Sequence, residues 1–151
     1  MNRVFIRAED LPLPCWAKTI EVFIKKVLKT MGKKDWELSV LFCSNRYIRS
    51  LNARYRNKDE ATDVLSFPLG ETDPLGRYMA GDIVISLDAL EENTRHFNVN
   101  TDEELRRLLV HGILHLMGED HASNREGEPM LVTQEKILAL INGPQTPEMA
   151  R

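Results

Sequence analysis

The sequence predicts a single α+β domain, with a mixed sheet of about four strands and about five helices. A length of 151 residues suits one domain. Short strand-like segments and amphipathic helical segments follow one another in mixed order, which is typical of this class. A composition of 42% hydrophobic and 28% charged residues suits a packed core and excludes a disordered or collagen-like chain. We expect the domain to span residues 1–143 and residues 144–151 to form a disordered tail.

The N-terminal half predicts a strand, a helix, a strand and a helix in that order. Apolar residues recur with helical period between Trp16 and Met31, and Gly32 is suited to end that helix. Asn45 is a suitable N-cap for the second helix. The predicted strands are residues 4–7 and 36–42, and the predicted helices are residues 16–31 and 45–55.

The C-terminal half predicts a hairpin followed by three helices. Pro68 is expected to end the first hairpin strand, because proline cannot donate to a sheet ladder. Thr101 and Glu104 have the spacing of a capping box, and Ser123 or Asn124 can cap the last helix. The predicted strands are residues 62–67 and 81–86 around a loop at 70–80, and the predicted helices are 88–97, 101–117 and a last one ending near 141.

The chain has the features of a cytoplasmic protein with reduced thiols. No apolar run approaches the ~18 residues of a membrane-spanning helix, and the N-terminus lacks a signal-peptide core. Cys15 and Cys43 are too few for a disulfide framework, and we expect both to be small buried residues.

The net charge of −3 hides a division between the two halves. Residues 1–58 hold 13 Lys and Arg against 5 Asp and Glu, whereas residues 59–151 hold 7 against 18. The basic half could bind a polyanion or form an ordinary solvated face. Aromatic residues sit at core periods, so no exposed aromatic run suited to base stacking is expected. The lysines that would suit backbone phosphates are Lys25, Lys26, Lys29, Lys33 and Lys34.

Three of the four histidines occur in one run, HGILHLMGEDH at residues 111–121. His111 and His115 are four apart on a predicted helix, so they project from one face about one turn, ~6 Å, apart. Gly118 permits the chain to leave the helix and turn back, which could bring His121 to the same point. Three imidazoles with one open position describe a catalytic zinc site. The sequence therefore predicts one divalent metal, with zinc favoured and nickel also compatible.

The run is similar to the long zincin signature HExxHxxGxxH, with one departure. Gly112 stands where zincins have the glutamate that takes a proton from zinc-bound water. If this chain were a zinc peptidase, it would therefore lack the main proton acceptor of that class. Glu119 or Asp120 could substitute, or Asp120 could orient a ligand histidine.

The same run resembles the HGxLHLxGxDH signature of the YbeY family of bacterial endoribonucleases. Residues 51–59, 62–68 and 81–86 also match that family in order and spacing. The resemblance implies a metal-dependent hydrolase that cleaves RNA, acting in ribosomal RNA maturation and ribosome quality control with the small ribosomal subunit as its partner. It also implies that His111, His115 and His121 bind the metal and that Arg56 is the other functional residue.

The sequence gives Arg56 a chemical role but leaves the nucleophile and two alternative functions open. Arg56 has a planar fork matched to phosphate, and we expect it to stabilise developing negative charge. The nucleophile is either water activated by the metal or the ribose 2′-hydroxyl. The alternative functions are a zinc peptidase and a non-enzymatic ribosome-assembly factor with a structural metal.

Overall fold

A mixed four-stranded sheet forms the middle layer of the protein. The computed structural model describes residues 1–118 and 129–142. The strand order is β1-β2-β4-β3, with β1 parallel to β2, β2 parallel to β4, and β3 antiparallel to β4. The strands are β1 (Arg3–Ala8), β2 (Trp36–Cys43), β3 (Val64–Thr72) and β4 (Tyr78–Ser86). The predicted α+β class and mixed sheet are confirmed.

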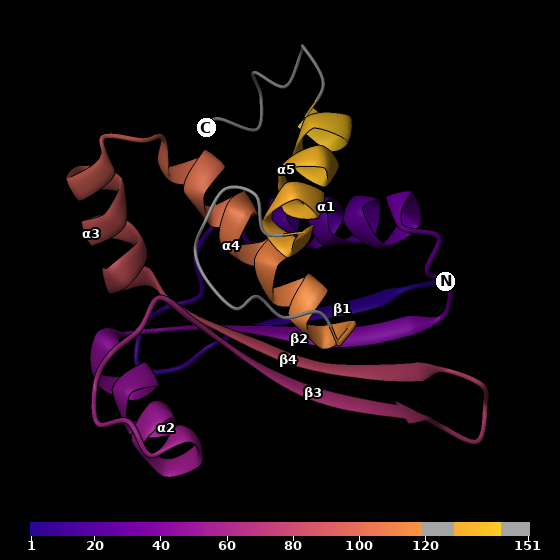
Figure 1. Ribbon diagram of the computed structural model, residues 1–151. Coiled ribbons are helices and arrows are strands. Elements are labelled where there is room, and N and C mark those ends of the chain that lie inside the picture. The colour runs from indigo at the N-terminus through magenta and orange to yellow at the C-terminus, as the bar shows by residue number, and fades with distance from the viewer. Residues whose placement is uncertain (119–128, 143–151) are drawn as a thin grey trace.

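Five helices accompany this sheet in the described part of the chain. Figure 1 shows α1, α4 and α5 above the sheet and α2 below it, with α3 at one end. The helices are α1 (Ala17–Thr30), α2 (Asn45–Arg56), α3 (Leu87–Phe97), α4 (Thr101–Leu116) and α5 (Pro129–Asn142). None of the helices within residues 1–118 and 129–142 combines the length and hydropathy needed to cross a lipid bilayer.

Alternating strand residues supply two hydrophobic cores, one on each face of the sheet. Ile83 and Ile85 of β4 face α4 in the larger core, whereas Val84 between them faces α2 in the smaller core. This alternation follows from the two-residue period of a strand. Phe23, Trp36 and Phe42 are buried, as their periods predicted. The larger core fixes α4 on the sheet.

The helix starts differ from the predicted caps. Ser44, rather than Asn45, caps α2 by accepting a hydrogen bond from the Tyr47 amide. Asn45 instead accepts from the Ser86 hydroxyl at 2.7 Å. Asn100, rather than Thr101, caps α4 through the Asp102 and Glu103 amides. In both cases the residue one position earlier also has a cap-forming side chain, and pattern alone does not separate neighbours. The predicted caps Ser123 and Asn124, and the predicted tail at 144–151, lie outside the described residues.

Pro68 does not end β3, and this prediction was wrong. The strand continues to Thr72, with Pro68 opposite Gly81 and an irregularity in the register just after it. β3 is an edge strand, where a missing amide hydrogen can face away from the sheet. Gly81 has φ +135°, and a Cβ there would lie 2.2 Å from the Phe67 carbonyl oxygen. Only glycine therefore fits at this position of the strand pair.

The two cysteines have different surroundings. Cys43 is fully buried, as predicted, and burial raises the pKa of its thiol to about 12. Cys15 is exposed, so its predicted burial was wrong. Cys15 lies just before α1, where the neighbouring Trp16 packs on Phe42 and leaves the smaller side chain outside.

Candidate functional site

The helix α4 brings His111 and His115 together on one face. Their rings meet edge to face with centroids 4.7 Å apart, and their Nε2 atoms are 3.1 Å apart. Both side chains are half-buried, and residues on the other faces of the helix are anchored in the core. The four-residue spacing therefore produces the convergence that the sequence predicted.

Gln134 of α5 fixes the orientation of the His111 ring. Its Oε1 lies 2.9 Å from His111 Nδ1, and its Nε2 donates to the Glu135 carboxylate at 3.2 Å. The carboxylate can only accept, so the amide oxygen is the group that faces His111. Nδ1 therefore carries the proton, and the lone pair of a neutral ring is on Nε2, towards His115.

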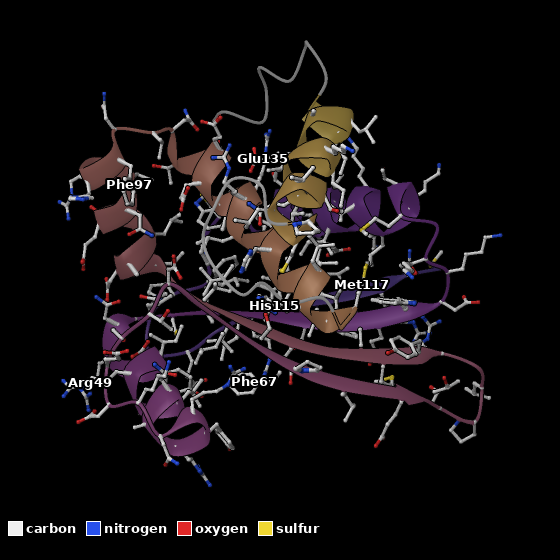
Figure 2. The ribbon with its side chains drawn as sticks, viewed as in Figure 1. Arg49, Phe67, Phe97, His115, Met117 and Glu135 are labelled. Atoms are coloured by element: carbon white, nitrogen blue, oxygen red, sulfur yellow. The ribbon has the colours of Figure 1, made fainter. Side chains whose placement is uncertain are left out.

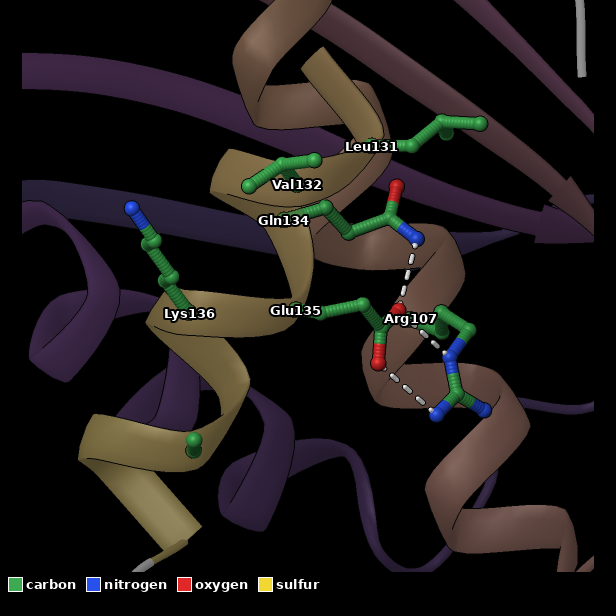
Figure 3. A pocket seen from close by; sticks show the side chains of 7 residues that line it. Arg107, Leu131, Val132, Gln134, Glu135 and Lys136 are labelled. Atoms are coloured by element: carbon green, nitrogen blue, oxygen red, sulfur yellow. Dashed lines mark hydrogen bonds and ion pairs between the residues drawn. The ribbon is translucent and has the colours of Figure 1, made fainter. Parts of the chain in front are cut away.

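An ion pair between α4 and α5 supports Gln134. Arg107 donates from Nε and Nη2 to the two oxygens of Glu135, at 2.9 Å and 3.1 Å, and Figure 3 shows this pair beside Gln134. The Arg107 hydrogen bond lowers the pKa of Glu135, so the carboxylate stays ionised. The resulting chain of contacts, Arg107–Glu135–Gln134–His111, connects the packing of the two helices to the position of one imidazole.

Gly112 is required by close packing of α4 on β4. A Cβ at this position would lie 2.9 Å from Cγ2 of Ile83, within the larger core. The Gly112 carbonyl accepts a hydrogen bond from the Ser66 hydroxyl of β3 at 3.5 Å. The position that carries glutamate in zincins therefore points at the sheet here and has no room for a side chain.

Arg56 enters the site from the opposite face of the sheet. It is the last residue of α2, and its Nη2 donates to the Ser66 carbonyl of the edge strand β3 at 2.7 Å. A cavity of about 170 Å³ is lined by Arg56, Val64, Leu65, Ser66, Pro68, His111 and His115. In Figure 2 His115 lies on the α4 side of the sheet and Phe67 on the α2 side. Residues 55 positions apart in the sequence thus line one pocket.

His111 also lines a second cavity, of about 430 Å³. Its lining includes two carboxylates, Asp63 and Glu104, together with Arg107 and Gln134. Glu104 is mostly buried, and this burial raises its pKa despite the nearby Arg107. Neither carboxylate stands out in the sequence as a candidate site residue.

Two of the three predicted metal ligands, His111 and His115, are arranged as a metal ion would require. The two Nε2 atoms are 3.1 Å apart, close to the separation of about 3.3 Å expected for two nitrogens bound to one tetrahedral zinc. Imidazole nitrogen suits zinc and nickel alike. Gly118 has φ +90°, so the chain turns at the predicted residue after α4. His121, Glu119 and Asp120 lie outside the described residues, and within residues 1–118 and 129–142 no three His, Cys, Asp or Glu side chains cluster to hold a metal.

The basic half of the chain divides between the two edges of the sheet. Lys25, Lys26 and Lys29 belong to α1, which packs on β1 at the edge opposite β3. Lys33 is placed over the Trp36 ring. Arg56 of α2, in contrast, lines the pocket. None of the predicted lysines lines the cavity that His111 and His115 share.

Sequence reasoning missed Gln134 and Ser66, which hold the site in place. Gln134 is 5% exposed and interrupts the apolar stripe of α5. That polar residue in an otherwise buried row was the available signal. Ser66 carried no comparable signal, because its two contacts come from residues distant in sequence.

Comparison with known proteins gives consistent similarities over nearly the whole domain. The family model described as Endoribonuclease YbeY matches residues 6–142. A relative from Treponema denticola named Endoribonuclease YbeY is 52% identical over 123 residues, covering 79% of each chain. One from Treponema pallidum with the same name is 43% identical over 143 residues, covering 92% of this chain and 89% of the relative. The solution structure of TM1509 from Thermotoga maritima has a TM-score of 0.64 at 31% identity, covering 93% of this chain and 89% of that one.

Proposed function

This chain belongs to the YbeY endoribonuclease family, and we propose that it is a metal-dependent endoribonuclease that cleaves single-stranded RNA. We assign it to ribosomal RNA maturation in the cytoplasm, chiefly at the 3′ end of the small-subunit RNA, and to ribosome quality control. The substrate class is supported by its relatives from Treponema denticola and Treponema pallidum, which are named as endoribonucleases.

The observation that carries this proposal is a single pocket shared by two imidazoles and a guanidinium. His111 and His115 line it from α4, and Arg56 lines it from α2 across the edge of β3. Phosphodiester cleavage needs positive charge at the phosphate oxygens. This pocket supplies one guanidinium and two imidazoles that would hold a metal ion.

We assign His111, His115 and His121 as the residues that would hold one divalent ion, zinc by preference. Such an ion would polarise a phosphate oxygen and lower the pKa of water bound to it. Gln134 prepares His111 for this role by keeping the proton on Nδ1 and the lone pair on Nε2.

Arg56 is positioned to bind the phosphate. Its hydrogen bond to the Ser66 carbonyl uses Nη2 and holds the guanidinium at the pocket wall. The other N–H groups can donate to non-bridging phosphate oxygens, where charge develops as the bond to phosphorus forms. We therefore propose that Arg56 is the catalytic residue of the described part of the chain.

The nucleophile can be identified from the product ends. Attack by water leaves a 5′-phosphate on one product or a 3′-phosphate on the other without a cyclic intermediate, whereas attack by the ribose 2′-hydroxyl leaves a 2′,3′-cyclic phosphate. A substrate with a single 2′-deoxy nucleotide at the cleavage position distinguishes them, because only the second route requires that hydroxyl.

The packing of Gly112 argues against a zinc peptidase. A glutamate there would meet Ile83 in the core instead of the pocket, so the proton acceptor of the zincin signature has no equivalent at this position.

The decisive experiment is cleavage of ribosomal RNA by purified protein with and without a chelator. We expect cleavage that the chelator abolishes and added zinc restores. A preparation of His111→Ala, purified identically, exposes any contaminating nuclease. Binding without cleavage by the metal-loaded protein would favour the assembly-factor function instead.

A further inference from the structure

An exposed aromatic pair lies beside the pocket. Tyr55 of α2 is 57% exposed, and its ring meets the half-buried Phe67 ring of β3 at 5.6 Å between centroids and 72° between planes. We call these two residues the aromatic ledge. We expected no exposed aromatic run suited to base stacking, and this pair is not a run in the sequence, because the two rings come from different elements.

Two arginines flank the ledge. Arg54 Cζ lies 5.3 Å from the Tyr55 ring centroid, and Arg56 Cζ lies 5.7 Å from the Phe67 centroid. Neither guanidinium forms an ion pair with a carboxylate within residues 1–118 and 129–142. Arg49, earlier on the same helix, is instead paired with Asp59 at 2.9 Å. Arg54 and Arg56, in the last turn of α2, therefore place two positive charges beside the ledge.

The ledge is continuous with the pocket through Arg56. This residue lines the cavity that also holds His111 and His115, and the same guanidinium contacts Phe67. Phe67 itself packs against the smaller core on the α2 side of the sheet, whereas its neighbours Ser66 and Pro68 line the cavity, so Arg56 is the residue that joins the ledge to the pocket. A phosphate bound by the Arg56 guanidinium would have its neighbouring nucleotide next to the two rings.

We propose that the aromatic ledge is a stacking subsite for one unpaired base of an RNA strand whose adjacent phosphate occupies the pocket. An aromatic side chain beside unpaired arginines is the combination that binds single strands, because every base has a π face and every nucleotide carries a negative phosphate. A base inside a duplex is already stacked and paired, so the ledge selects single strands. This inference rests on the proposed function and adds a position for the base.

The test measures binding of a single-stranded oligoribonucleotide in chelator, so that cleavage does not interfere. Tyr55→Ala should weaken binding about tenfold, as expected for loss of one stacking contact. Tyr55→Phe and Tyr55→Trp should retain it, because both keep an aromatic face. Phe97→Ala is the matched control, since Phe97 is a 62% exposed aromatic on α3 with its own edge-to-face partner, His96. Circular dichroism verifies that each variant is folded.

A fluorescent base gives an independent measurement. A 2-aminopurine placed one nucleotide from the cleavage position should be quenched when the wild-type protein binds, and Tyr55→Ala should remove that quenching. Equal affinity of Tyr55→Ala and wild type, loss of affinity in Tyr55→Phe, or an equal loss in Phe97→Ala would overturn the subsite. Unchanged binding by Tyr55→Ala together with normal wild-type cleavage would reject the ledge alone, whereas a wild-type protein that cleaves no RNA would reject the proposed function.

Discussion

His111 Nδ1 lies 2.9 Å from Gln134 Oε1, and this contact joins the site helix to α5. We predict that Gln134→Leu lowers the affinity for zinc by about 10- to 100-fold, because the tautomer of His111 is no longer fixed. Gln134→Glu keeps an oxygen acceptor and should retain most of the affinity. Competition with a chromophoric chelator measures both variants, and wild-type affinity in Gln134→Leu would show that the contact does not position the ligand.

Replacing a predicted ligand should remove the metal. We predict that His115→Ala contains little zinc after purification, whereas the wild type contains close to one ion per chain. His96→Ala is the control, because His96 is exposed on α3 and contacts Phe97 instead of the pocket. Elemental analysis with parallel protein quantification gives the ratio. Full metal content in His115→Ala would refute the ligand assignment.

Loss of the guanidinium should affect catalysis more than folding. We predict that Arg56→Ala reduces the rate of RNA cleavage at least about tenfold while metal content is unchanged. Arg56→Lys should also cleave RNA slowly, since an ammonium group lacks the planar fork of a guanidinium. Arg49→Ala serves as the matched control on the same helix, because Arg49 is paired with Asp59 away from the pocket. Cleavage by Arg56→Ala at the wild-type rate would exclude the proposed role.

The contact between Gly112 and Ile83 predicts a stability cost for any side chain on this face of α4. Gly112→Ala should destabilise the fold by about 1–2 kcal/mol, because overpacking outweighs the gain in helix propensity. Gly112→Glu should cost more, since it also buries a carboxylate. Urea unfolding gives the difference. The double variant Gly112→Ala, Ile83→Ala should lose less stability than the sum of the two single variants, because alanine at position 83 removes all three atoms that the new Cβ would meet. Strict additivity would show that the two positions do not meet.

The two thiols should differ in reactivity and in their effect on stability. At pH 8 a thiol reagent should modify Cys15 rapidly and Cys43 only after unfolding, because Cys15 is exposed and Cys43 is buried. The pKa of Cys43 is raised from 9.0 to about 12, so the folded state retains a proton that the unfolded state releases. Stability is therefore lost as pH rises from about 9 to about 12. Cys43→Ala should reduce that slope in unfolding experiments, and an unchanged slope would assign it to other groups.

Local patterns in the sequence were sufficient to predict the helices and strands and the convergence of His111 and His115. The period of α4 placed His111 and His115 on one face, and the structure has their Nε2 atoms 3.1 Å apart. Gly118 was correctly identified as a turn residue, since positive φ is a local requirement that glycine meets.

Contacts between distant elements could not be predicted in this way. The Gln134 contact to His111 depends on how α5 packs on α4, and the Tyr55–Phe67 pair depends on how α2 meets β3. Pro68 was misjudged for the same reason, because whether proline ends a strand depends on whether that strand lies at the edge of the sheet.

The position of β3 at the margin of the sheet has a consequence for solubility. An uncovered strand margin can recruit another chain and start aggregation. Pro68 offers no amide hydrogen to an incoming strand, and Arg56 already engages the outward Ser66 carbonyl. The wall of the pocket is therefore protected against intermolecular strand addition by the same arginine that faces the histidines.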